Sequence, residues 1–185
     1  MRRLTLSLLV AWPFAVCADA PTLDPETGLA TWQTETGGVQ VRLTQIGPDQ
    51  ARAFYQARGF SAPAAERYAT ECVFMTVVRN VGDTPVEHRL ADWRYLHQGK
   101  RLPIRSKTEW AQIWKQLRVN EAARIAFDWA QFPATQTFAP GDWNQGMTTY
   151  RVGRGERFDL QFVWRKDGKT FSGTLQEVQC AADAS

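Results

Sequence analysis

The chain has few of the side chains on which most enzyme chemistry depends. Its 185 residues include two histidines and three cysteines, and no His-x-His, His-Glu-x-x-His or Cys-x-x-Cys motif brings them together. It also lacks a Gly-x-Ser-x-Gly segment and a glycine-rich phosphate loop. These absences argue against nucleophilic hydrolases, thiol oxidoreductases and nucleotide-binding enzymes. We therefore expect a protein without catalytic activity and without a bound cofactor.

Long hydrophobic runs are equally scarce. One short apolar run, residues 4–16, follows Arg2 and Arg3 and precedes small residues. A membrane-spanning helix needs about 20 apolar residues, whereas this run is shorter and contains Pro13. The pattern is typical of a cleaved signal peptide at residues 1–18, and it predicts a periplasmic or secreted protein with no transmembrane anchor.

Two variants of this export signal stay open. Cys17 could carry a lipid anchor, although the residue before a lipidated cysteine is normally small and here it is Val16. The twin arginines could direct export of an already folded protein. The strongly apolar run that follows them favours the ordinary signal peptide.

The charge balance of the mature chain argues against a nucleic-acid partner. The full sequence has 22 basic and 19 acidic residues. Removal of residues 1–18 takes Arg2 and Arg3 and no acidic residue, which leaves 20 basic and 19 acidic residues and a net charge of +1. A nearly neutral protein without blocks of like charge lacks the electrostatic footprint of a nucleic-acid binder.

The two cysteines of the mature chain predict one disulfide. Cys72 begins an apolar segment that has the pattern of a buried strand, and Cys180 ends the last apolar stretch. An even number of cysteines in an exported protein favours pairing. We expect a structural Cys72–Cys180 bond that ties a central strand to the final one.

Alternating apolar and polar residues recur through most of the chain and predict a mainly β fold. About seven or eight short strands at intervals of 8–12 residues favour an antiparallel β-sandwich of immunoglobulin-like architecture. Helical spacing occurs in a short segment near 48–58 and in an insertion at about 106–132. We expect a loose N-terminal lead-in at 19–36 and a single sandwich domain at 37–182. A break in alternation near Ala91 indicates a β-bulge.

The helical insertion begins with a capping box, Ser106-Lys107-Thr108-Glu109. The apolar residues that follow have the spacing i, i+3, i+4 and i+7 of an amphipathic helix; they are Trp110, Ile113, Trp114 and Leu117. We expect this row to pack on the sandwich rather than to face a partner.

The favoured function is binding to another protein of the bacterial envelope, as an accessory or assembly module. Trp143 lies in the polar segment 141–146, which has no periodicity and therefore reads as a loop. Exposed aromatic and arginine side chains dominate binding energies at interfaces. We therefore expect Trp143, with Tyr150 and Arg151 in the following strand, to contact the partner.

Two other functions stay open. A copper or small-ligand carrier could use two imidazoles and two thioethers; the candidate ligands are His88, His97, Met75 and Met147. A carbohydrate-binding module could use the seven tryptophans of the mature chain as stacking surfaces. A pair of catalytic carboxylates has weaker support, because Glu71 is the one acidic residue in an apolar context.

Overall fold

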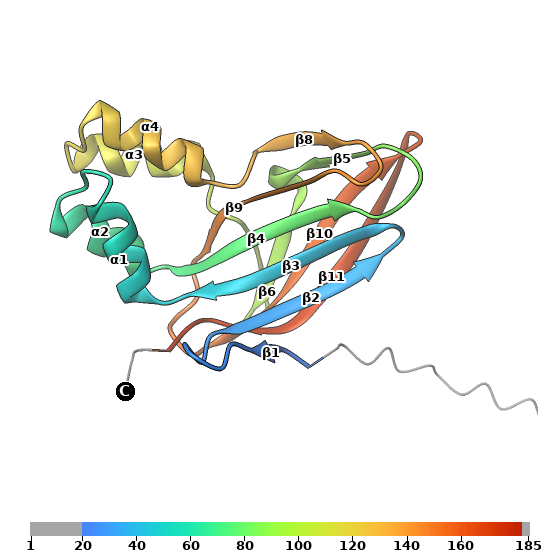
Figure 1. Cartoon of the computed structure of the whole chain (residues 1–185), viewed down its shortest axis with the longest axis horizontal. Helices are drawn as coiled ribbons and strands as arrows, with labels where there is room; N and C mark the ends of the chain where they lie inside the picture. Colours follow the sequence, from blue (N-terminus) through green and yellow to red (C-terminus); the bar gives the residue numbers. More distant parts are fainter. Residues whose placement is uncertain (1–19, 183–185) are drawn as a thin grey trace, which may run out of the picture.

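The computed structural model describes residues 20–182, and they form two antiparallel sheets packed as a β-sandwich (Figure 1). The predicted signal peptide and Cys17 lie outside the described residues. Sheet A has the strand order β1-β2-β3-β4-β9. Its strands are β1 Thr22–Leu23, β2 Ala30–Thr36, β3 Val39–Ile46, β4 Cys72–Asn80 and β9 Trp143–Tyr150.

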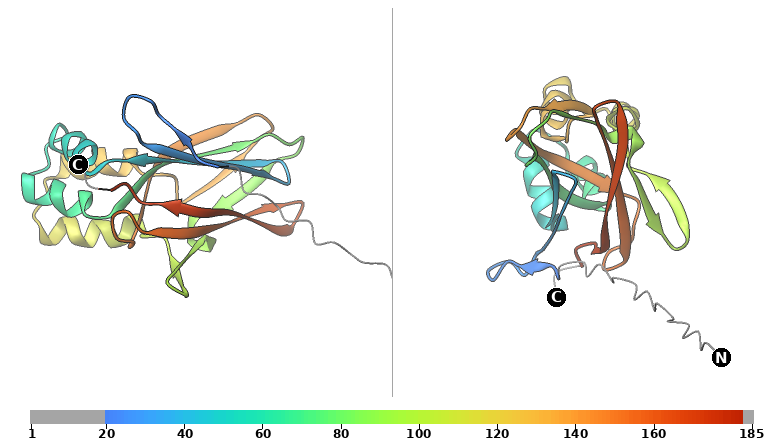
Figure 2. Two further views of the ribbon diagram at one scale, coloured as in Figure 1. Left: turned by 90° about the horizontal axis from the view of Figure 1, so that it is seen from below. Right: turned by 90° about the vertical axis from the view of Figure 1, so that its right-hand side faces the viewer.

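Sheet B is built around its long strand β10, Arg157–Lys166. β11 follows one edge of β10 over its whole length, and β6 and β5 pair with successive parts of the other edge. The hairpin of β6 and β7 projects from the sandwich (Figure 2). The remaining strands of sheet B are β5 Val86–Arg89, β6 Arg94–His97, β7 Lys100–Pro103, β8 Thr135–Phe138 and β11 Lys169–Gln179.

Four helices gather at one end of the sandwich (Figure 1). They are α1 Pro48–Gln56, α2 Ala62–Ala69, α3 Lys107–Gln116 and α4 Glu121–Ala130. Side chains cap three of them at their N-termini, because Ser61, Ser106 and Asn120 each accept a hydrogen bond from a backbone N–H in the first turn. The helices predicted near 48–58 and within 106–132 are confirmed, as is the capping box at Ser106.

Three expectations about the strands are wrong. The lead-in at 19–36 is not loose, because Ala30–Thr36 forms β2 and pairs with β3. The sandwich therefore begins before residue 37. The break near Ala91 is a 3₁₀ turn, Leu90–Asp92, rather than a bulge. Trp143 is the first residue of β9 and not part of a loop.

Two hydrophobic cores meet at sheet A. Between the sheets lies a core that contains the alternating aromatic residues of β10 together with Phe74, Trp93 and Tyr150. On the outer side of sheet A, the helices form a second core, in which Trp110 and Trp114 stack with ring centroids 4.8 Å apart. Trp93, Trp110, Trp114 and Trp164 are all buried, as their spacing predicts.

The predicted disulfide is confirmed. Cys72 at the start of β4 and Cys180 after β11 are bonded, with their Cα atoms 5.3 Å apart and a sequence separation of 108 residues. Both residues are buried in the core between the sheets. The bond therefore joins sheet A to the end of the chain in sheet B.

We predict that loss of this bond lowers the free energy of unfolding by about 2–5 kcal/mol. The bond closes a long loop and so restricts the conformational entropy of the unfolded chain, and its loss removes that restriction. Cys72→Ala and Cys180→Ala should have similar effects in urea denaturation, and the double variant should cost little more than either single one. Strictly additive effects of the two substitutions would contradict a shared bond.

Trp114→Ala should lower the free energy of unfolding by roughly 3–5 kcal/mol, because it empties the centre of the helical core. Trp129→Ala is the matched control, since Trp129 is 85% exposed and should change stability by less than about 0.5 kcal/mol. Thermal or urea denaturation measures both. Equal stability of the two variants would show that the helices do not depend on this core.

Candidate functional site

A buried hydrogen-bond network joins the helices to sheet A. The side-chain nitrogen of Gln131 donates to the hydroxyl oxygens of Tyr55 and Tyr68, at 2.7 and 3.1 Å. The hydroxyl of Tyr55 donates in turn to the sulfur of Met147 on β9, at 3.4 Å. Burial raises the pKa of both phenols above the ordinary value, so both stay protonated. Each polar group in this network has a hydrogen-bond partner within it, so we assign the network a structural role.

The side chain of Glu71 is only 7% exposed, and it has the contacts of a structural ion pair. Its carboxylate lies 2.8 Å from the guanidinium of Arg67 and 3.0 Å from that of Arg105. Both guanidinium groups also face the ring of Trp110, at 5.5 and 5.0 Å from its centroid. Glu71 thus joins helix α2 to the segment before α3, and the contacts of its carboxylate with two cations do not suit a catalytic acid.

His88 lies in an aromatic pocket of the core and has no other ligand-type side chain beside it. Its ring centroid is 5.1–5.9 Å from the rings of Trp93, Phe132 and Phe138. Among residues 20–182, neither ring nitrogen has a hydrogen-bond partner. Burial lowers the pKa of His88 to about 4, so the imidazole is neutral at pH 7.

The other candidate metal ligands lie elsewhere. His88 is opposite Trp164 on β10, whereas Nδ1 of His97 lies 3.0 Å from the carbonyl oxygen of Arg157, seven residues along the same strand. Seven residues of a strand span about 23 Å. Met75 and Met147 are paired on the outer face of sheet A. The four residues therefore do not form one site, and residues 20–182 contain no group of three or more His, Cys, Asp or Glu side chains that could hold a metal ion.

His88 predicts an acid-sensitive stability. A pKa that falls from 6.5 in the unfolded chain to about 4 in the folded protein gives stability that is fully present above pH 6.5 and is lost as the pH falls toward 4. Between pH 7 and pH 5 this group should remove about 2 kcal/mol from the free energy of unfolding. Urea denaturation of wild type and His88→Phe at both pH values measures the difference. An equal loss in both proteins would contradict the assignment.

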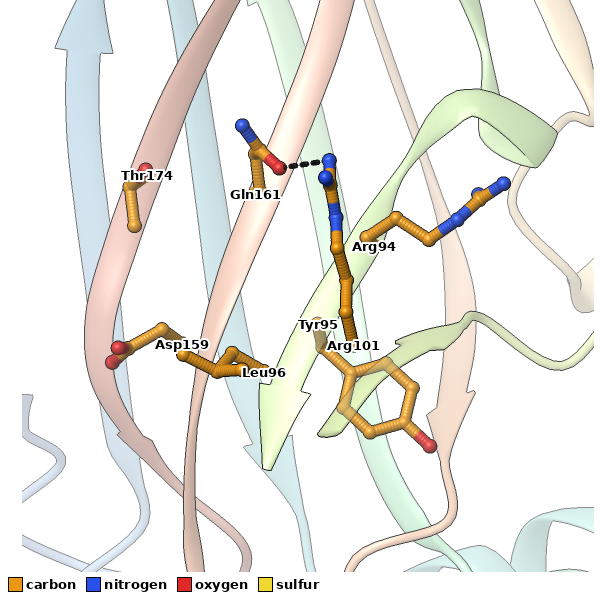
Figure 3. A pocket seen from close by; sticks show the side chains of 7 residues that line it. All are labelled: Arg94, Tyr95, Leu96, Arg101, Asp159, Gln161 and Thr174. Atoms are coloured by element: carbon orange, nitrogen blue, oxygen red, sulfur yellow. Dashed lines mark hydrogen bonds between the residues drawn. The ribbon is translucent and has the colours of Figure 1, made fainter. Parts of the chain in front are cut away.

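A groove of about 250 Å³ lies on the outer face of sheet B, beside the projecting β6–β7 hairpin (Figure 3). The exposed side chain of Leu96 lies between polar groups that already have partners within the protein. The guanidinium of Arg101 donates to Gln161, and Asp159 accepts the backbone N–H of Glu177. Arg94 donates to two backbone carbonyls close in sequence. The groove therefore presents few unoccupied polar groups to a ligand.

The structure places two of the three predicted partner-binding residues differently, and Arg151 stays a prediction. Tyr150 is completely buried and its ring lies 4.5 Å from that of Phe158, so it cannot contact a partner at the surface. Arg151 is exposed, but its guanidinium is paired with Glu109, the residue that completes the capping box of α3. Arg151 therefore fastens the end of β9 to a helix.

Trp143 differs from these two residues because it is on the open part of sheet A. Residues that are directly opposite on neighbouring strands share one face of a sheet. The pairings Glu35–Gln40, Gln40–Arg79 and Arg79–Trp143 therefore place a row of four side chains on the outer face. The next row contains Gln33, Arg42, Val77 and Gln145. We call the part of these two rows on β3, β4 and β9 the open face; it consists of Gln40, Arg79, Trp143, Arg42, Val77 and Gln145, and Gln33 and Glu35 on β2 form its border.

The open face combines an exposed aromatic side chain with unpaired positive charge. The side chain of Trp143 is 57% exposed, and Val77 beside it is half-buried. Arg42 and Arg79 are exposed, and within residues 20–182 neither guanidinium forms an ion pair with a carboxylate. The following rows of the sheet, which contain Met147 and Thr149, are covered by the helices. This face is the candidate functional site.

Trp129 and Ile125 are surface residues that helical periodicity alone does not distinguish from core residues. Both are on α4, one turn apart, and are 85% and 52% exposed. Of the seven tryptophans in residues 20–182, five are buried and two are exposed, namely Trp129 and Trp143. These two are on different elements, so the tryptophans do not form one continuous stacking platform.

No helix among residues 20–182 has both the length and the apolar character needed to cross a membrane. Comparisons of the chain with protein-family models, with curated proteins and with solved structures give no match.

Proposed function

We propose that this protein is an exported, non-enzymatic binding module that docks another protein of the bacterial envelope through the open face of sheet A. The observation that carries the proposal is Trp143, an aromatic side chain that is 57% exposed on strand β9 beside Arg79. Tryptophan and arginine are the residue types most enriched among binding hot spots. A strand also fixes their positions before binding, which lowers the entropic cost of association.

The charge of the open face suggests the chemistry of the partner. Arg42 is opposite Val77 and Arg79 is opposite Trp143, and neither guanidinium group has a carboxylate ion-pair partner within the described part of the chain. Glu35, at the border of this face, lies beyond Gln40 in the row of Arg79. A complementary surface would place acidic side chains around an apolar centre. We do not expect nucleic acid to be the ligand, because the mature chain has a net charge of only +1 and the two arginines are not part of a longer basic stripe.

The proposed location depends on the sequence. The basic start and short apolar run of residues 1–18 support cleavage and release into the periplasm or the medium. The Cys72–Cys180 bond supports an oxidising compartment. We also propose that the sandwich has immunoglobulin-like architecture, with support from its two antiparallel sheets and from a bond that crosses between them.

The test is quantitative capture from solubilised envelope, followed by affinity measurement with the purified partner. Trp143→Ala should weaken binding by about 2 kcal/mol or more, roughly 30-fold in Kd, while the melting temperature stays that of wild type. Arg79→Glu should weaken binding through charge reversal.

The matched control is Thr174→Ala in the groove of sheet B, which should bind as wild type does. The proposal would be overturned if wild type and Trp143→Ala bind the partner with equal affinity. It would also be overturned if Thr174→Ala is the only variant that loses binding.

A further inference from the structure

Helix α4 has two apolar faces, and the protein covers only one of them. Ala123 and Phe127 point into the helical core and are buried. A second set of apolar residues has the spacing i, i+3, i+4 and i+7, which places them along one side of a helix. We call this set the outer face of α4; it consists of Ala122, Ile125, Ala126 and Trp129.

The fold does not need the outer face. Asn120 caps the helix, and Phe127 anchors it with ring contacts to Trp114 and Tyr68 at 5.2 and 5.6 Å. Ile125 and Trp129 are not part of that core, and 52% and 85% of their surfaces are exposed. A contiguous apolar surface with polar edges on a soluble domain marks an interaction site.

The edge of this face is acidic. At 100° per residue, Glu121 and Asp128 lie within about 20° of each other and next to Ile125. Both side chains are exposed, and among the described residues neither carboxylate has an ion-pair partner. Lys107 reaches the end of the helix but donates to the backbone carbonyl of Asp128. Arg124 lies on the far side of this edge, away from the apolar row.

We propose that the outer face of α4 is a second docking surface and that it binds an amphipathic helix with lysine or arginine along one edge. The apolar row of such a helix would cover Ile125 and Trp129, and its basic edge would meet Glu121 and Asp128. This partner chemistry is the opposite of that expected at the open face of sheet A, so the two surfaces are independent.

The acidic edge disfavours the two other occupants of an exposed apolar helix. In an antiparallel two-fold pair of α4 helices, the edge with Glu121 and Asp128 would meet the same edge of the second copy, and like charges would repel. An anionic lipid surface would be repelled by the same carboxylates. A basic amphipathic helix would cover the apolar row and would also place positive charge beside Glu121 and Asp128.

The test uses two synthetic peptides of about 20 residues with the same leucine face, one with lysines and one with glutamates along the edge. Fluorescence anisotropy of the labelled peptides, titrated with the full mature protein, measures affinity. We expect the lysine peptide to bind at least 10-fold more tightly than the glutamate peptide. Trp129→Ala should weaken binding of the lysine peptide at least 10-fold. Trp143→Ala, which removes the other exposed tryptophan, is the matched control and should leave the affinity for that peptide unchanged.

A double charge reversal separates this proposal from non-specific apolar binding. Glu121→Lys combined with Asp128→Lys should make the glutamate peptide the tighter ligand. Melting curves should show a folded protein with a small loss of stability, because Glu121 is in the first turn of α4, where a negative charge is favourable. Equal affinity for both peptides, or a preference that survives the reversal, would overturn the proposal. The proposal would also be overturned if neither peptide binds and the protein instead self-associates, or binds anionic vesicles, in a way that Trp129→Ala abolishes.

Discussion

The close approach of the backbone at Gln131 and Phe132 to Gly146 fixes where the helices lie on sheet A. A side-chain carbon at position 146 would be 2.3 Å from the backbone nitrogen of Phe132, so only glycine allows this contact. Phe132 donates its N–H to the carbonyl oxygen of Met147, and Gln131 carries the hydrogen bonds to Tyr55 and Tyr68. The helical core is therefore seated on one half of sheet A and leaves the other half uncovered.

This position of the helices gives the molecule two surfaces of opposite chemistry. The uncovered half of sheet A presents Trp143 beside Arg79, whereas the outside of α4 presents Trp129 beside Glu121 and Asp128. The first surface is on strands and the second on a helix, and neither includes residues of the groove of sheet B. Because the two surfaces differ in charge, we expect them to select different partners, as an accessory or assembly module would require.

Much of the fold could be predicted from periodicity, because strict alternation and capping residues are local signals. The disulfide, the helix after Ser106 and the strand β10 follow from such signals. β2 was missed because its inward residues, among them Trp32, alternate with threonine, glutamine and glutamate in a segment that looks like a loop. The start of β9 was missed because Gly146 reads as a turn residue, although it is a strand residue that another segment approaches.

The candidate site was predicted only in part, because burial depends on tertiary packing. Trp143 is exposed as expected, whereas Tyr150 is buried and Arg151 is engaged with Glu109. Sequence periodicity shows that α4 is apolar on two sides, but it does not show which side the sheet covers. Likewise, His88 and His97 are close in sequence but lie at separate places along β10, since the intervening 3₁₀ turn places them on different strands.

Site-specific photo-crosslinking in the native envelope tests the central claim most directly. A photoreactive side chain at Gln145, an exposed position of the open face next to Trp143, should form a covalent adduct with one envelope protein. The same group at Thr174, in the groove of sheet B, should form none. An adduct from Thr174 together with none from Gln145 would contradict the assignment of the open face as the binding surface.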